Sequence, residues 1–339
     1  MLYGIAAATA ALLLTALLAS LLRTPARRLG IVDRRRQRPV PLPGGAAVVL
    51  ATCAVAAAGD RTGVAPLGDG IGRLLAAGAG VAALGLVGDA WRLKTRFLVV
   101  GTAVAAACVV PYGETGVPGG LLAVGWIVWV ALAFKGLDHG DGLAGTVGVV
   151  TAFGVGACAA AEVMDGLAVL LSVLAAALTG FLMHNWHPAR VGLGAGGSLF
   201  TGFVLASAAL ITRTGYGLVP SAGVLFALTA VASADAVLVV LARRIAGRPL
   251  LRRGPDHLGH RLRRRGLTAQ GATVVLGAGA FSTVLVGVLV HTGWIGAQAV
   301  FWVAGATLLG VLGVLRLSVR GPRRTASVQV RPQLRVRSG

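Results

Sequence analysis

Charge is scarce in this chain of 339 residues: Asp, Glu, Lys and Arg make up 12% of it, against 56% hydrophobic residues, and the mean hydropathy is +0.83. So apolar a composition excludes an ordinary soluble domain. Three cysteines, Cys53, Cys108 and Cys158, stand alone in apolar runs, with no CxxC pair or Cys/His cluster, which excludes a zinc ribbon and a disulfide framework. The sequence also lacks the internal repeats that mark many secondary transporters.

The chain consists instead of long apolar runs. Backbone polar groups in lipid must be paired internally, so runs of this length predict helices, whereas barrel strands would alternate. We therefore predict an all-α polytopic membrane protein of about 11 transmembrane helices. The first run has no basic residue before it, so we expect a retained helix rather than a cleaved signal peptide. The predicted spans are 3–22, 44–59, 71–88, 97–112, 120–134, 142–162, 166–183, 197–212, 220–242, 271–292 and 297–315.

The basic residues are distributed unevenly between the connections. The formal net charge of +20 is compatible with nucleic-acid binding, but 28 of the 31 Lys and Arg residues lie in alternate connections and the C-terminal segment. By the positive-inside rule, the N-terminus is outside and the Arg-rich connections are cytoplasmic, facing membrane lipids rather than nucleic acid. We expect a membrane domain over 1–317 and a basic, disordered cytoplasmic tail over 318–339.

The most polar short stretch is "FKGLDHGDGLAG", residues 134–145. Asp138 and Asp141 are three residues apart, so a helical turn would place both carboxylates on one face at the membrane boundary. Paired carboxylates beside glycines suit a magnesium–diphosphate site, because hard cations take oxygen ligands and glycine lets a phosphate approach the backbone. A solvated turn between two helices is the alternative, and this stretch alone leaves it open.

Further polar groups occur in the other predicted cytoplasmic connections. Asp89 is followed by a run of cations in "LGLVGDAWRLKTRF", and Gly194–Ser198 opens a span whose helix N-terminus offers amides to an anion. His257 and His260 lie among arginines in "RRGPDHLGHRLRRRGL", a poor metal site but a good diphosphate clamp. Taken singly, each has a plain alternative: a salt-bridged helix end, a turn before a span and a topogenic basic loop.

The order of these motifs resembles that of the polyprenyl-phosphate N-acetylhexosamine-1-phosphate transferases, which include phospho-N-acetylmuramoyl-pentapeptide-transferase and the UDP-GlcNAc:undecaprenyl-phosphate GlcNAc-1-phosphate transferases. The similarity covers nearly the whole chain. The matching segments are "LGIVDRRRQRPVPLPGGAAVVL", "LGLVGDAWRLKTR", "FKGLDHGDGLAG", "ARVGLGAGGSLFTGFVLA" and "SADAVLVVLARRIAGRPLLRRGPDHLGHRLRRRGLT".

The resemblance implies a bacterial cell-membrane enzyme that is active on its cytoplasmic face. It would transfer a sugar-1-phosphate from a UDP-N-acetylamino sugar to polyprenyl phosphate with Mg²⁺, release UMP and start a cell-envelope glycan such as peptidoglycan; a homodimer is left open. It also implies residue roles. The catalytic residues would be Asp89, Asp138 and Asp141, with Asp89 and Asp141 as metal ligands, and the substrate-binding residues would be Ser198, His257, His260 and Arg261. We also expect Lys135 and His139 to bind substrate.

Several positions depart from the motifs of that family. The first aspartate of its D-D pair is Gly88 here, and the asparagine ahead of its D-G-x-D element is Lys135. The glycine after the first aspartate of that element is His139, the aspartate of L-G-D-x-G-S is Ala195, and the middle histidine of H-x-H-H is Gly259. Each lost oxygen ligand should weaken a magnesium site.

These departures leave a second interpretation open: a catalytically impaired member that binds polyprenyl phosphate or envelope-assembly partners. In the first interpretation, His139, Lys135 and the arginines replace metal charge with protein charge. A transporter is a third hypothesis, based on Asp235 inside a predicted span, and it would need a polar path through the bilayer.

Overall fold

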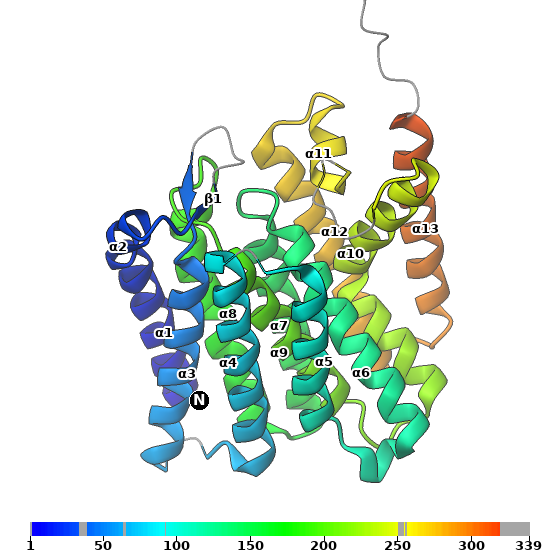
Figure 1. The fold of residues 1–339 in the computed structure, drawn as a ribbon. Helices are drawn as coiled ribbons and strands as arrows, with labels where there is room; N and C mark the ends of the chain where they lie inside the picture. The colour runs from blue at the N-terminus through cyan, green and yellow to red at the C-terminus, as the bar shows by residue number, and fades with distance from the viewer. Residues whose placement is uncertain are drawn as a thin grey trace, which may run out of the picture.

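Apolar helices stand side by side over almost the whole of the computed structural model (Figure 1), as expected of a chain that must pair its backbone groups within each membrane segment. The structure describes residues 2–33, 39–63, 66–91, 93–249, 254 and 256–318. The helices are α1 (Leu2–Leu21), α2 (Arg23–Arg28), α3 (Gly44–Arg61), α4 (Gly68–Trp91), α5 (Thr95–Val109), α6 (Tyr112–Leu137), α7 (Leu143–Ala161), α8 (Asp165–Asn185), α9 (Gly194–Ile211), α10 (Leu218–Ile245), α11 (Leu258–Arg263), α12 (Ala269–His291) and α13 (Ala299–Ser318).

The protein is a polytopic membrane protein. Within the described ranges, 10 helices are long and apolar enough to cross a membrane. The remaining predicted span, 97–112, forms α5, an apolar helix of 15 residues that covers about 22 Å at 1.5 Å per residue. The hydrocarbon core of a bilayer is about 30 Å thick, so α5 is short for a full crossing. Every predicted span therefore corresponds to an apolar helix.

Helix α9 lies at the centre of the bundle, and 89% of its most apolar window is buried. Glycines let three neighbours approach it closely. A Cβ at Gly85 in α4 would lie 2.6 Å from the Cα of Gly196, and a Cβ at Gly202 would lie 2.7 Å from the Cα of Ala131 in α6. Gly45 in α3 is in equally close contact with the α9 backbone. The N-terminus of α9 is thereby fixed relative to α3, α4 and α6.

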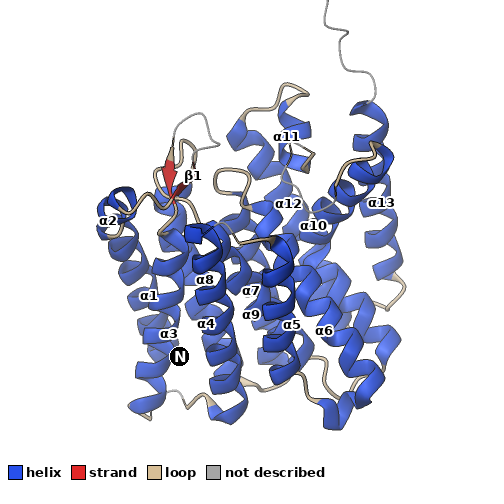
Figure 2. Ribbon diagram, in the orientation of Figure 1, coloured by secondary structure: helices blue, strands red, loops and turns tan. Residues whose placement is uncertain are grey.

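Helices α2 and α11, the C-terminal end of α13 and a small strand pair gather at one end of the bundle (Figures 1 and 2). The strands, β1 (Val32–Asp33) and β2 (Val40–Pro41), form an antiparallel ladder. Several predicted basic connections therefore share one end, as the alternating charge pattern requires; that this end is cytoplasmic stays a prediction. The predicted tail, apart from Ser318, lies outside the described residues, as do Arg92, Arg252 and Arg253.

At the end of the bundle opposite to α2 and α11, a cluster of polar side chains lies beyond the C-terminus of α9. Arg213, only 6% exposed, donates to Nδ1 of His291 at 3.0 Å, and its guanidinium lies 3.8 Å from the ring centre of Tyr216. The Glu162 carboxylate accepts from the Tyr216 hydroxyl at 2.6 Å and lies 3.2 Å from Nε2 of His291. These contacts join the ends of α7, α9 and α12.

Candidate active site

The polar stretch 138–142 is a tight turn between α6 and α7, not a further turn of helix. Asp138 follows the last residue of α6, and α7 begins after Gly142, whose φ is +73°. The Gly142 amide donates to Oδ1 of Asn185 at 2.8 Å, and the Asn185 amide group donates to the Val191 carbonyl at 2.7 Å. Asn185, 2% exposed, therefore ties this turn to the segment before α9. Asn185 was not among the predicted site residues. In the sequence it could have been noticed only as a polar side chain at the end of an apolar run.

Two of the predicted carboxylates meet at the N-terminus of α9. Oδ2 of Asp138 accepts from the Gly194 amide at 3.0 Å, and Oδ2 of Asp89, from the end of α4, accepts from the Ala195 amide at 2.6 Å. Carboxylates are favourable there, because the first amides of a helix have no partner within it and carry a partial positive charge. A helix does begin at Gly194, and two of its first amides bind the protein's own carboxylates; that it binds an anion stays a prediction.

The third predicted carboxylate, Asp141, has different partners. Its Oδ2 lies 2.8 Å from Nδ1 of His187 and accepts from the Ala189 amide at 3.2 Å. The Asp141 backbone carbonyl accepts from the Thr273 hydroxyl at 3.0 Å, which brings α12 to the turn. Asp138 and Asp141, three residues apart, therefore contact two separate segments. His187, which was not among the predicted site residues, is a partner of a candidate catalytic carboxylate.

Three imidazoles from two elements pack together beside this turn. The ring of His139 stacks on that of His257, with centres 4.2 Å apart and planes 19° apart, and its centre lies 4.7 Å from that of His260. Burial, the largest effect, lowers the pKa of His139 to about 3. Burial also lowers the pKa of His260, as do the nearby His257, Arg263 and Arg264. Both rings are therefore neutral near pH 7, and Arg263 and Arg264 supply positive charge beside them.

Asp235 connects this imidazole cluster to α10. It is 1% exposed, and its carboxylate accepts from the Leu258 amide at 2.7 Å and lies 2.7 Å from Nδ1 of His257. One buried carboxylate thus holds both the first residue of α11 and the histidine before it. These internal partners account for an acid within a membrane span without a polar path through the bilayer.

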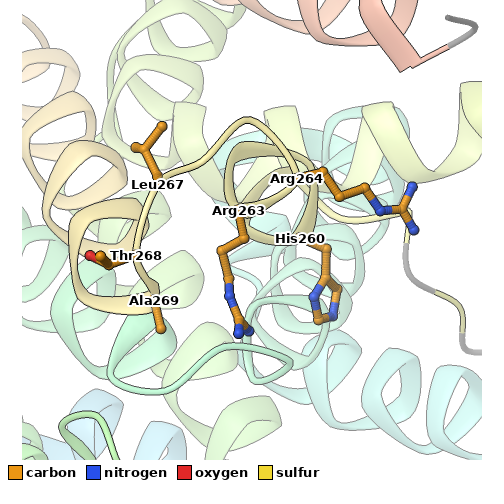
Figure 3. A pocket seen from close by; sticks show the side chains of 6 residues that line it. All are labelled: His260, Arg263, Arg264, Leu267, Thr268 and Ala269. Atoms are coloured by element: carbon orange, nitrogen blue, oxygen red, sulfur yellow. The ribbon is translucent and has the colours of Figure 1, made fainter. Parts of the chain in front are cut away.

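A cavity of about 440 Å³ opens next to α11 (Figure 3). The side chains of His260 and Arg263 extend in the same direction in the figure. Thr268 caps α12 by accepting from the Gly271 amide at 2.9 Å. Guanidinium groups suit phosphate oxygens, so the cavity can take an anion. Its lining residues are His260, Arg263, Arg264, Leu267, Thr268 and Ala269.

Two predicted substrate-binding residues point elsewhere. Arg261 is 8% exposed, and its guanidinium donates to the carbonyls of Asp256 at 3.1 Å and Val314 at 3.3 Å. It therefore joins α11 to α13, and Arg263 and Arg264 line the cavity instead. Ser198 is fully buried in α9, where its hydroxyl donates to the Gly194 carbonyl at 2.6 Å. Neither orientation can be read from sequence, because a helical register decides it. Lys135 lies in the last turn of α6, where a cation is favourable.

Among the described residues, the side chains that come close enough to hold one metal ion are not the predicted metal ligands. Donor atoms of His139, Asp235 and His257 lie within 4.8 Å of one another. Two nitrogens and one oxygen suit a zinc-type ion rather than magnesium, which prefers oxygen. Asp89 and Asp141, the predicted metal ligands, accept from the amides of Ala195 and Ala189, six residues apart at the start of α9 and in the connection before it. Asp89 and Asp138 are the carboxylates on adjacent amides, and magnesium commonly takes one or two carboxylates and completes its shell with water and substrate phosphate.

Comparison with known proteins shows similarity to a glycosyltransferase family. Residues 72–213, which include Asp89, Asp138, Asp141 and the start of α9, match the family described as Glycosyl transferase family 4. The chain is 69% identical over 327 residues to a Streptomyces coelicolor protein named as a putative glycosyltransferase, covering 95% of this chain and 80% of that protein.

More distant relatives carry more specific names. The chain is 29% identical over 285 residues to the decaprenyl-phosphate N-acetylglucosaminephosphotransferase of Mycobacterium tuberculosis, covering 71% of this chain and 70% of that protein. It is 27% identical over 292 residues to a probable undecaprenyl-phosphate N-acetylglucosaminyl 1-phosphate transferase of Bacillus subtilis, covering 78% and 79%.

Proposed function

The chain belongs to glycosyl transferase family 4, and on this premise we propose that it transfers a sugar-1-phosphate from a UDP-N-acetylamino sugar to polyprenyl phosphate. The product would be a lipid-linked diphosphosugar that starts a cell-envelope glycan, and UMP would be released. The names of the mycobacterial and Bacillus relatives support both the polyprenyl acceptor and the N-acetylglucosamine-phosphate donor.

The observation that carries this proposal is the convergence of Asp89 and Asp138 on the first amides of α9, beside the turn that bears His139. Carboxylates from two membrane helices meet at one end of the bundle, and an arginine-lined cavity lies next to the imidazole that contacts this turn. A membrane-bound phosphate and a soluble nucleotide can reach such an end from their own phases.

The reaction makes one bond and breaks one. An oxygen of the lipid phosphate bonds to the β-phosphorus of the nucleotide sugar, the bond from that phosphorus to the bridging oxygen breaks, and UMP leaves with the electron pair. Transfer of this kind needs chiefly positioning and charge neutralisation. Arg263 and Arg264 would bind the diphosphate, with the neutral His260 as a hydrogen-bonding partner. Asp141, paired with His187, would take a proton from the lipid phosphate.

Magnesium, when bound, would neutralise charge on the diphosphate. Asp89 and Asp138 fit this role better than the predicted pair, because their carboxylates lie on neighbouring amides. The basic end of the bundle would face the cytoplasm, following the positive-inside rule.

The altered motif positions support a second candidate, a member that binds polyprenyl phosphate with little turnover. Ala195 offers no carboxylate, and a carboxylate placed there would lie beside that of Asp89, which already binds the Ala195 amide. A site with fewer acids holds magnesium less strongly.

The test is UMP release by the purified protein, given polyprenyl phosphate, Mg²⁺ and a panel of UDP-N-acetylamino sugars. We expect release from the wild type and a loss of at least about 100-fold in Asp138→Asn and Asp141→Asn, the size typical of removing a group that acts on the transition state. Asp165→Asn, in the first turn of α8 at the other end of the bundle, is the matched control. No release by the wild type across the panel, with lipid binding retained, would favour the non-catalytic candidate.

A further inference from the structure

The first residues of α11 pass unusually close to the turn between α6 and α7. A Cβ at Gly259 would lie 2.8 Å from Nε2 of His139, closer than real Cβ contacts come. An ordinary van der Waals contact with Leu143 lies at 3.7 Å on the same side. Glycine is therefore required at position 259 by one particular neighbour, the imidazole of His139.

His139 has little freedom to move away from a new methyl group. Its Nδ1 lies 2.9 Å from the Gly136 carbonyl, which ties the ring to the end of its own helix. One face of the ring is stacked on His257, and His260 packs beside it. Nε2 is buried and has no hydrogen-bond partner among the residues that the structure describes. Displacing the ring would break the Gly136 contact, the His257 stack or both.

Positions 139 and 259 are also two of the departures identified from sequence. The motif has glycine after its first aspartate and histidine as the middle residue of H-x-H-H, whereas this chain has His139 and Gly259. In space the two altered positions touch. The imidazole missing from α11 is thus matched by an imidazole entering the same cluster from the turn.

We propose that His139 and Gly259 are a matched pair, in which His139 supplies the third imidazole of the cluster and positions His257 and His260 for the substrate. The part of this proposal that concerns substrate rests on the proposed function. The two changes form one coupled exchange, not two separate losses. His139 acts through the imidazoles that it orients, so it is a positioning residue.

A double-mutant cycle tests the pair without any assay of turnover. The variants are Gly259→Ala, His139→Gly and the double variant, and the measurement is the thermal midpoint of the purified protein in detergent. Gly259→Ala should lower the midpoint by several degrees in the wild-type background and by no more than the control in the His139→Gly background. Gly125→Ala is the control, since a Cβ there would meet nothing within 4 Å. Equal effects of Gly259→Ala in both backgrounds would overturn the pairing.

The positioning role has its own measurements. Carbethoxylation by diethyl pyrocarbonate, followed by peptide mass spectrometry, should be severalfold faster at His257 in His139→Gly, because the stacked ring no longer covers it. The exchanged variant, His139→Gly with Gly259→His, should bring the labelling rate and the KM for the nucleotide sugar back towards wild type, while His139→Gly alone raises KM roughly tenfold. Unchanged labelling in His139→Gly, or no recovery in the exchanged variant, would overturn the positioning role.

These outcomes are separable from the proposed function. Absence of UMP release in the wild type would remove the transferase, whereas the thermal cycle and the labelling rates would still decide whether His139 and Gly259 act as a pair.

Discussion

Replacing Asp235 by alanine should loosen the attachment of α11 to the bundle. The carboxylate is 1% exposed and holds two groups that precede or begin α11: the Leu258 amide, at 2.7 Å, and Nδ1 of His257, at 2.7 Å. Alanine leaves both without this partner. Each group then bears a desolvation cost that the carboxylate had offset.

The magnitude follows from these two contacts. An unsatisfied buried donor costs about 1–3 kcal/mol, and removing one member of a buried charged pair costs about 3–5 kcal/mol. We therefore expect Asp235→Ala to lower the free energy of unfolding by about 3–5 kcal/mol. Asp235→Asn should cost about 1–2 kcal/mol, because the amide oxygen can still accept from Leu258 and His257 can change tautomer.

Two measurements check this expectation. The thermal midpoint in detergent should fall by about 5–10 °C in Asp235→Ala, and trypsin should cut after Arg263 and Arg264 faster than in the wild type. Thr229→Val, on the same helix, is the control, because the Thr229 hydroxyl, also buried, donates within α10, to the Leu225 carbonyl at 2.8 Å. A midpoint no lower than that of the control, with unchanged cleavage, would refute the assignment of Asp235 as the anchor of α11.

Three other results are expected. Asp89→Asn and Asp138→Asn should each lower stability by about 1–2 kcal/mol through a weaker bond to the α9 amides, measured as the thermal midpoint, and neither should be stabilising. Burial and neighbouring cations lower the pKa of His260, so below its ordinary pKa the folded state binds fewer protons than the unfolded state. The midpoint should therefore fall from about pH 7 to pH 5, and His260→Gln should flatten that slope. Arg213→Gln should lower the midpoint, because its buried contact with His291 at the far end is lost, but a changed KM for the nucleotide sugar would contradict that remote role.

The membrane architecture could be predicted from sequence almost completely. Every predicted apolar run became a helix, because the length and composition of a run decide whether its backbone must form internal hydrogen bonds in lipid. The exception in detail is α5, whose 15 residues are short for a span. Spacing misled at Asp138 and Asp141, where it suggested a helical turn: α6 ends at Leu137, both aspartates lie in the turn before α7, and their carboxylates have different partners.

For the candidate site, the sequence could predict candidate residues but not how their side chains are arranged. Sequence indicated Asp89, Asp138 and the histidines as polar groups at one membrane boundary, but it also included Ser198 and Arg261, whose side chains bond within the protein. Which way a residue faces depends on helical register and on neighbours distant in the chain.

Sequence by itself therefore determined that this is a helical membrane protein with its basic residues concentrated in alternate connections and a family signature in them. Only the tertiary structure decided that Asp89 and Asp138 share the start of α9, that Asp235 anchors α11, and that His139 fills the space left by Gly259. The physical reason is the distance along the chain over which each effect works. The hydropathy of a segment decides by itself whether that segment forms a membrane helix, whereas these contacts join residues up to 120 positions apart.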